Sequence, residues 1–325
     1  MDLNRSTPPG PWDWRPASPS RWQQPVTLVR LEGPDSLRFL HGQSSQDLER
    51  AQPGQCLATC CLTPTGRVRG LAEVLVDASG AWLVITAGDG AAIHQALDRV
   101  LFPADQVNLG PLLAGTLICL EGLEAAGSLE APATPASPAA GWSLPGQRLV
   151  LREDEELPAE LEALPALGPI ESERWRLSQG RALAPHEISD EVNPFEIGVA
   201  DRVSLSKGCY VGQETLAKLA TYDGVKQQLR RWCWAEPAAG SASDGPAPLP
   251  GAVLRTPSGE RAGRITSSLR LNAGPDGTSL WLGLALVRRQ ALLEPLLLTG
   301  EGIGLEISEP TGVVAPPVGA GGAAS

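Results

Sequence analysis

Residues 207–214, KGCYVGQE, combine a lysine, a cysteine and two glycines in a chain otherwise rich in alanine, leucine, proline and glycine. Cys209 has the side chain that can act as a nucleophile or metal ligand, and its thiolate is the reactive form. Gly208 permits a tight turn or the close approach of a ligand to the backbone. Lys207 favours the thiolate, because a nearby cation lowers the pKa of a thiol. The stretch therefore predicts a reactive Cys209 with Lys207 beside it.

The second half of this stretch predicts the start of a helix. Gly212 can adopt the backbone geometry of the helix entry, and Gln213 and Glu214 then occupy the first turn. Amide and acidic groups there complement the unpaired N–H groups and the positive end of the helix dipole. Cys209 lies a few residues ahead of that end, which also favours its thiolate. The structural alternative is a plain turn in which Cys209 is a small buried hydrophobe.

The other cysteines and histidines do not form a metal-binding pattern. Cys56, Cys60 and Cys61 lie among apolar residues, with no C-x-x-C motif and no histidine at zinc spacing. We therefore expect small core hydrophobes and predict no metal site. Six cysteines without regular pairing also differ from the disulfide framework of a secreted protein. His186 and Glu187 are a candidate acid–base pair, but they lack the H-E-x-x-H spacing of a metalloprotease.

The composition limits the classes of partner. The chain has 325 residues, a net charge of −11 and a pI near 4.9. The negative electrostatic field of such a chain repels nucleic acid and anionic membranes, so direct DNA binding is not expected. Residues 226–300 are locally basic, which leaves open either a face for an anionic ligand or scattered solvated arginines. The sequence shows no apolar stretch typical of a secretory signal or a membrane span, so we expect a cytoplasmic protein that does not bind membranes.

The order of the predicted elements indicates an α+β fold with an all-β C-terminal domain. The predicted divisions are a Pro/Trp-rich arm without regular structure (1–25), an α+β body of two subdomains (26–226) with a Pro/Ala-rich loop (125–141), a β-barrel (227–310) and a disordered tail (311–325).

Turn signals place the strands. Residues 54–88 predict three strands separated by hairpin turns at 63–66 and 78–80. From residue 227 onward, short strands alternate with turn signals at short intervals. This spacing is typical of a small barrel or sandwich.

Capping residues and apolar periodicity place the helices. A first helix is expected after a cap at Asp35 or Ser36. A second helix is predicted over 89–102 with Val100 on its buried face, and a third over 171–180.

KGCYVGQE resembles the signature of the YgfZ family of folate-binding-type proteins, which are related to the T-protein (aminomethyltransferase) of the glycine cleavage system. The family pattern is K-G-C-[FY]-x-G-Q-E, and every fixed position is present at 207–214. Other segments are also similar to the family: FLHGQSSQDLERAQPGQCLATCCLTPTGRVRG at 39–70, RWRLSQGRALAPHEISDEVNPFEIG at 174–198, RAGRITSSLR at 261–270 and LGLALVRR at 282–289. The resemblance covers residues 26–310.

The resemblance implies the T-protein cloverleaf, in which two α+β units surround a central cavity and a C-terminal β-barrel follows. It implies a cavity for tetrahydrofolate or a related folate. It also implies a role in assembling or repairing iron–sulfur clusters of client enzymes, including those that thiolate tRNA. Cys209 would be the redox or ligating thiol of a functional loop whose other members are Lys207, Gly208, Tyr210, Gly212, Gln213 and Glu214. The candidate folate-binding residues are Arg67, Arg174 and Glu187.

The chain departs from the T-protein where that enzyme holds its carboxylates. The T-protein has a G-G-x-x-D-D segment after its early strand turn, whereas Arg69 and Gly70 occupy about these positions here. Its pterin-binding glutamate has no counterpart, since the nearest candidate is Gln147. Guanidinium and glycine cannot replace a carboxylate that holds or removes a proton, so we expect a factor without conventional turnover. The alternatives are a tetrahydrofolate-dependent one-carbon transferase and a β-rich scaffold with an inert thiol.

Overall fold

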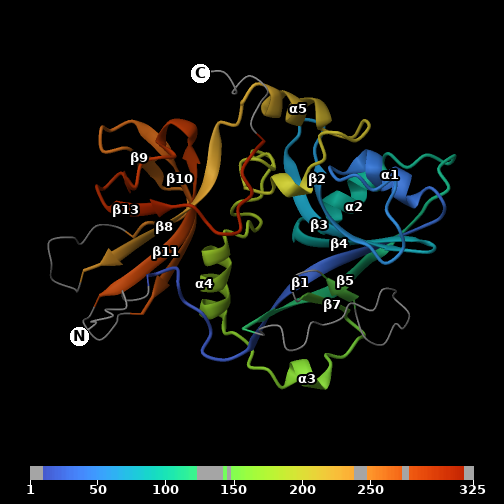
Figure 1. The fold of residues 1–325 in the computed structure, drawn as a ribbon, viewed down its shortest axis with the longest axis horizontal. Coiled ribbons are helices and arrows are strands. Elements are labelled where there is room, and N and C mark those ends of the chain that lie inside the picture. Colours follow the sequence, from blue (N-terminus) through green and yellow to red (C-terminus); the bar gives the residue numbers. More distant parts are fainter. Residues whose placement is uncertain (1–9, 123–141, 145–147, 238–246, 273–277, 318–325) are drawn as a thin grey trace, which may run out of the picture.

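The computed structural model describes residues 10–122, 142–144, 148–237, 247–272 and 278–317. It contains an antiparallel sheet and a closed β-barrel, with helix α4 (Pro169–Gln179) between them (Figure 1). No helix in these residues is long and apolar enough to span a membrane.

The sheet is formed by the first half of the chain. It has seven strands in the order β2-β3-β4-β1-β5-β7-β6, and all neighbours are antiparallel. The strands are β1 (Ser20–Glu32), β2 (Cys56–Leu62), β3 (Val68–Asp77), β4 (Gly80–Gly88), β5 (Asn108–Glu121), β6 (Trp142–Leu144) and β7 (Arg148–Arg152). The turns predicted at 63–66 and 78–80 are confirmed, because they join β2 to β3 and β3 to β4. All seven strands thus belong to one continuous sheet.

The second half of the chain forms the barrel. Its six strands close in the order β10-β11-β8-β13-β12-β9. They are β8 (Gln227–Glu236), β9 (Val253–Arg255), β10 (Arg261–Leu271), β11 (Ser279–Arg288), β12 (Leu296–Leu298) and β13 (Gly304–Ser308). Trp232 is fully buried inside it and donates from Nε1 to the Leu284 carbonyl at 3.1 Å. Burial of this large ring, with its one polar atom satisfied, stabilises the barrel interior.

The helices pack on the sheet or link it to the barrel. Besides α4 they are α1 (Ser36–Gln43), α2 (Gly90–Asp98), α3 (Ala159–Glu162), α5 (Gln213–Thr221), η1 (Ala200–Arg202) and η2 (Arg289–Ala291). The predicted start of α1 after Asp35 and the end of α4 at Gly180 are confirmed. The predicted burial of Val100 is wrong, because α2 ends at Asp98 and Val100 is 38% exposed beyond it.

Both ends of the chain are more structured than the sequence predicts. Strand β1 begins at Ser20, inside the predicted arm 1–25. Pro25 disfavoured the prediction of a strand here. In the structure it pairs with Thr116 of β5, whereas pairing with β4 starts only at Thr27. A proline is tolerated there because one side of this stretch needs no N–H donor. In the predicted tail, the Val314 amide donates to the Gly198 carbonyl at 2.8 Å, so this part of the tail is docked on the body.

The whole of the predicted 125–141 loop lies outside the described residues. In the N-terminal arm, Trp12 and Trp14 contact the guanidinium groups of Arg231 and Arg174, with ring centroids 4.9 and 5.2 Å away. These cation–π contacts dock the described part of the arm onto the body.

A buried ionic cluster joins α4 to the barrel. Arg176 of α4 donates to Glu187 at 3.0 Å, to Ser267 of β10 at 2.8 Å and to Glu173 at 2.7 Å. Ser267 donates to the other Glu187 oxygen at 2.6 Å, and the Leu183 amide donates to Glu187 at 3.1 Å. Glu187 is 0% exposed. Because each charged group is paired and hydrogen-bonded, the cluster fixes the barrel relative to α4.

We predict that Glu187→Gln lowers the free energy of unfolding by about 2 kcal/mol, because it leaves Arg176 buried with only one carboxylate partner. Urea denaturation of the full chain measures this change. Glu214→Gln is the matched control, since Glu214 pairs with Lys218 on the exposed surface of α5 and its loss should not change stability measurably. Equal midpoints for wild type and Glu187→Gln would contradict the structural role of the cluster.

Candidate functional site

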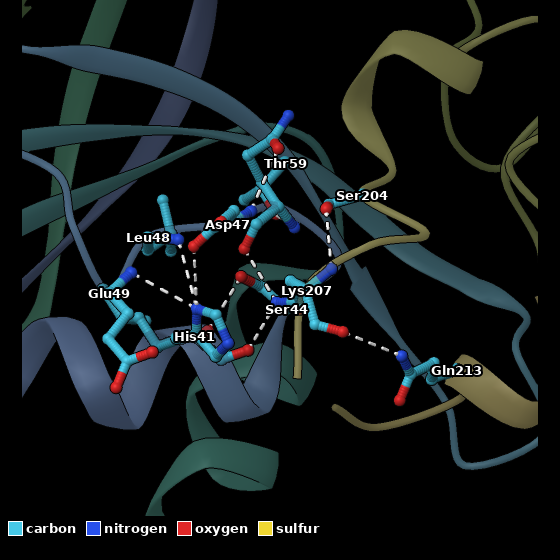
Figure 2. Close-up of polar contacts among 11 residues, drawn as sticks. His41, Ser44, Asp47, Leu48, Glu49, Thr59, Ser204, Lys207 and Gln213 are labelled. Atoms are coloured by element: carbon cyan, nitrogen blue, oxygen red, sulfur yellow. Dashed lines mark hydrogen bonds and ion pairs between the residues drawn. The ribbon is translucent and has the colours of Figure 1, made fainter. Parts of the chain in front are cut away.

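Lys207 anchors the 207–214 loop to the end of α1. Its ammonium donates to the carbonyls of His41, Ser44 and Gln46 at 2.5, 2.6 and 2.7 Å (Figure 2). It also lies 4.4 Å from the centre of the Tyr210 ring. Helix α1 ends at Gln43, so carbonyls in and after its last turn lack helical partners and carry the negative end of the dipole. A buried cation with three donors satisfies these acceptors together.

This anchor changes the role predicted for Lys207. All three N–H donors of the ammonium are taken by carbonyls, so it is not available to the Cys209 sulfur. Burial lowers the pKa of Lys207 to about 7, while the Asp47 carboxylate acts in the opposite direction. Sequence proximity suggested a Lys207–Cys209 pair, but the lysine side chain is directed into the protein. Lys207 is therefore a positioning residue of the loop.

Two glycines fix the loop against the β2–β3 hairpin. Gly212 has φ +83°, and a Cβ there would lie 2.8 Å from the Thr63 carbonyl oxygen and 2.9 Å from the Gly66 Cα. Gly66 has φ +72°, and its Cβ would lie 3.0 Å from the Thr215 Cβ. Backbone therefore packs directly on backbone, and α5 begins at the next residue as predicted.

The remaining signature residues have separate positions. Tyr210 is buried, and burial raises its pKa to about 12. Gln213 donates to the Lys207 carbonyl at 3.2 Å, whereas Glu214 pairs with Lys218 on the surface at 2.7 Å. Lys207, Tyr210 and Gln213 thus fix the conformation of the 207–214 loop.

Cys209 is exposed, and it is the one exposed cysteine of the chain. The alternative of a buried turn cysteine is therefore wrong. Among the others, burial raises the pKa of Cys56, Cys60, Cys61 and Cys233 to about 12 and also raises that of Cys119. Thiols with raised pKa values and little access to solvent are inert. In the described residues no group of three or more His, Cys, Asp or Glu is arranged to hold a metal ion.

A cavity of about 460 Å³ lies between the sheet, α4 and the 180–202 segment. This volume is typical of small-molecule sites. Trp22 and Gln24 of β1 form part of its wall, and Asp201 is the one acidic residue among those that line it. Four arginines line it as well: Arg148, Arg176, Arg181 and Arg202. The wall is therefore aromatic on one side and predominantly cationic.

The arginines of the cavity differ in their partners. Arg148 and Arg202 both donate to the same oxygen of Glu73, at 3.0 and 3.1 Å, and Glu73 is 2% exposed. Arg181 makes no ion pair with a described carboxylate. Its guanidinium lies 4.3 Å from the centre of the Trp175 ring and donates to the Cys119 sulfur at 3.7 Å. Arg181 therefore supplies positive charge that the protein does not neutralise within the cavity.

The predicted folate-binding residues do not line this cavity. Arg67 lies at a separate cleft and donates to the Glu191 carbonyl at 2.7 Å. Arg174 lies on the side of α4 that faces the N-terminal arm, against Trp14. Glu187 is buried and already paired with Arg176. Cys209 is also not among the lining residues, so the exposed thiol and the cavity are separate features of the surface.

The residues that line the cavity were not predicted as site residues from the sequence. The one local signal was Glu73, a charged residue in the buried run of β3. Gly70 has no room for a side chain, since a Cβ there would lie 2.5 Å from the Ala87 carbonyl oxygen. Gln147 lies outside the described residues.

Comparisons with known proteins agree with this architecture. No protein-family model matches the chain. The chain is 28% identical over 311 residues to a chloroplastic Arabidopsis thaliana protein described as a candidate transferase, covering 86% of this chain and 68% of that protein. It is 27% identical over 284 residues to the tRNA-modifying protein YgfZ of Yersinia pseudotuberculosis, covering 80% of this chain and 81% of YgfZ.

Among solved structures, the glycine cleavage system aminomethyltransferase T of Bartonella henselae superposes with a TM-score of 0.65 at 20% identity. The match covers 93% of this chain and 88% of that protein, so the fold is that of the T-protein. Together these similarities confirm the resemblance to YgfZ and the T-protein.

The lowered pKa of Lys207 predicts a pH-dependent stability. Between about pH 7, the folded pKa, and about 10.4, the ordinary lysine value, the unfolded chain binds more protons than the folded chain. The free energy of unfolding of the wild type should therefore rise across this window relative to that of Lys207→Met. Urea denaturation at several pH values between 6.5 and 10 measures this difference, and a difference that is independent of pH would contradict the lowered pKa.

Proposed function

We propose, from the similarity of this chain to YgfZ and to the T-protein, that it is a folate-binding-type accessory factor in iron–sulfur cluster assembly or repair. It acts on iron–sulfur enzymes, including those that thiolate tRNA, through the 207–214 loop and without conventional turnover. The similarity to a tRNA-modifying protein supports the tRNA-related clients.

The single observation that carries this proposal is the exposure of Cys209 on an anchored loop. Lys207 and Gly212 fix the loop on both sides of the cysteine, while the thiol remains accessible. A protein that exchanges sulfur, electrons or iron with large partners needs such a thiol at its surface. An active site that performs turnover on a small substrate would enclose its nucleophile in a cavity instead.

The cavity fits the chemistry of a folate. A folate combines a planar pterin with a carboxylate tail. Trp22 contributes apolar surface to the wall, and Arg181 offers a guanidinium that pairs with no described carboxylate. Asp201 is placed to accept hydrogen bonds from donors on a bound ring. When bound, tetrahydrofolate supplies a reduced pterin and a carrier for one-carbon groups.

A tetrahydrofolate-dependent one-carbon transferase is the second candidate function. Asp201 on the cavity wall and the similarity to a candidate transferase favour it. The crowding at Gly70 and the presence of Arg69 oppose it, because the resemblance implies acidic residues at about these two positions in the T-protein. Formation of methylene-tetrahydrofolate from tetrahydrofolate and an aminomethyl donor, catalysed by the purified chain, would establish this candidate.

We predict that Cys209→Ala fails to restore the activities of iron–sulfur enzymes in a strain that lacks this protein, whereas wild type restores them. The reason is that the accessible thiol is removed while the loop anchors remain. Cys56→Ala is the matched control and should rescue fully, since burial keeps that thiol inert. Equal rescue by wild type and Cys209→Ala would remove Cys209 from the mechanism.

We predict that Arg181→Ala weakens tetrahydrofolate binding about tenfold or more, because a charge-assisted hydrogen bond contributes about 1.5–3 kcal/mol. Equilibrium titration of the full chain, followed by tryptophan fluorescence, measures the dissociation constant. Arg174→Ala removes an arginine away from the cavity and should bind like wild type. Absence of a saturable signal from wild type at high micromolar ligand would contradict the assignment of the cavity.

A further inference from the structure

Gly208 has no structural reason to be glycine. It is absent from the residues with positive φ. A Cβ added to it would meet one atom within 4 Å, the His41 Nε2 at 3.8 Å, which is an ordinary contact distance. By contrast, Gly212 and Gly66 are required by both backbone conformation and crowding. Open space therefore separates Gly208 from the edge of the His41 ring, directly before the exposed Cys209.

The His41 ring presents a hydrogen-bond donor to this space. His41 is 9% exposed, and its Nδ1 accepts from the Leu48 and Glu49 amides at 3.3 and 3.2 Å (Figure 2). A nitrogen that accepts from two amides carries no proton, so the network assigns the ring proton to Nε2. The Asp47 carboxylate also approaches Nδ1, at 3.3 Å. Nε2 has no hydrogen-bond partner among the described residues.

From this geometry we propose that His41 is the positioning residue of Cys209, donating from Nε2 to the cysteine sulfur anion across the space left open by Gly208. Exposed side chains change rotamer within nanoseconds, so Cys209 can turn toward His41 without movement of the anchored loop. The inference deepens the function proposed above, since it rests on Cys209 as the acting thiol.

The substrate class follows from the other cysteines. Cys209 is the one exposed thiol, and the remaining five cysteines are buried or half-buried and unpaired. The loop anchors also prevent Cys209 from moving toward them. A disulfide at Cys209 therefore forms with a sulfur from another molecule, and the site accepts an external disulfide rather than closing an internal one.

The exchange step is balanced without a further oxidant. Cys209 loses its proton to water, and its thiolate attacks one sulfur of the external disulfide. A new S–S bond forms as the old one breaks. The second sulfur departs as a thiolate with the electron pair of the broken bond and takes a proton from water. His41 contributes by stabilising the attacking anion in the correct orientation.

The test measures exchange of the full chain with 4,4′-dithiodipyridine, followed by the absorbance of the released thiopyridone between pH 5 and 9. Cys209→Ser gives the background. His41→Leu should slow exchange at pH 7 about tenfold and move the pH midpoint upward, because a charge-assisted hydrogen bond is lost. His41→Gln should remain within about twofold of wild type, since its amide oxygen can accept from Leu48 and Glu49 while its NH₂ group donates toward Cys209.

Gly208→Ala is the variant that keeps the proposal testable if His41→Leu unfolds. A methyl group fits beside His41 without a clash, so the free energy of unfolding should be unchanged or slightly higher. Exchange should nevertheless slow, because the methyl group separates Nε2 from the sulfur. Wild-type rates and pH profiles in both folded His41→Leu and Gly208→Ala would overturn the proposal. That result would leave the function proposed above intact if Cys209→Ala still fails to rescue the deletion strain.

Discussion

The contact between the Lys207 ammonium and the carbonyls behind α1 is the constraint on which the loop depends. It ties a segment from the second half of the chain to the first helix, and neighbouring hydrogen bonds extend the join. The Ser204 amide donates to the Ser45 carbonyl at 2.9 Å, and the Val211 amide donates to the Gly42 carbonyl at 3.0 Å. With both flanks of the loop fixed, Tyr210 is directed inward and Cys209 outward.

A second constraint, the ionic cluster around Arg176, determines the shape of the cavity. Arg176 connects α4 to β10, while Glu73 holds Arg148 and Arg202 against each other from the opposite wall. These arginines are already satisfied within the protein and act as a rigid lining. Arg181 is different, because its guanidinium lies against aromatic rings and pairs with no described carboxylate. Three of the four arginines that line the cavity are thus paired within the protein, whereas the guanidinium of Arg181 is available to a ligand.

Local patterns predicted most of the secondary structure, because hairpin turns, helix caps and strand alternation are properties of neighbouring residues. They also identified the loop that carries Cys209. They could not show that Lys207 points away from Cys209, since two residues of sequence separation do not decide the direction of a long side chain. The lining of the cavity was missed for a related reason. Trp22, Arg148 and Arg181 come from distant parts of the chain, and only the folded topology brings them together.

The wall of the cavity is built from both ends of the folded chain. It includes Trp22 of the first strand and Gly312, beyond the last strand of the barrel. The cavity therefore has its complete wall only after residue 312 has been synthesised and the C-terminal segment has docked beside Gly198. Formation of this wall joins the first strand of the sheet to a segment that leaves the ribosome almost 300 residues later.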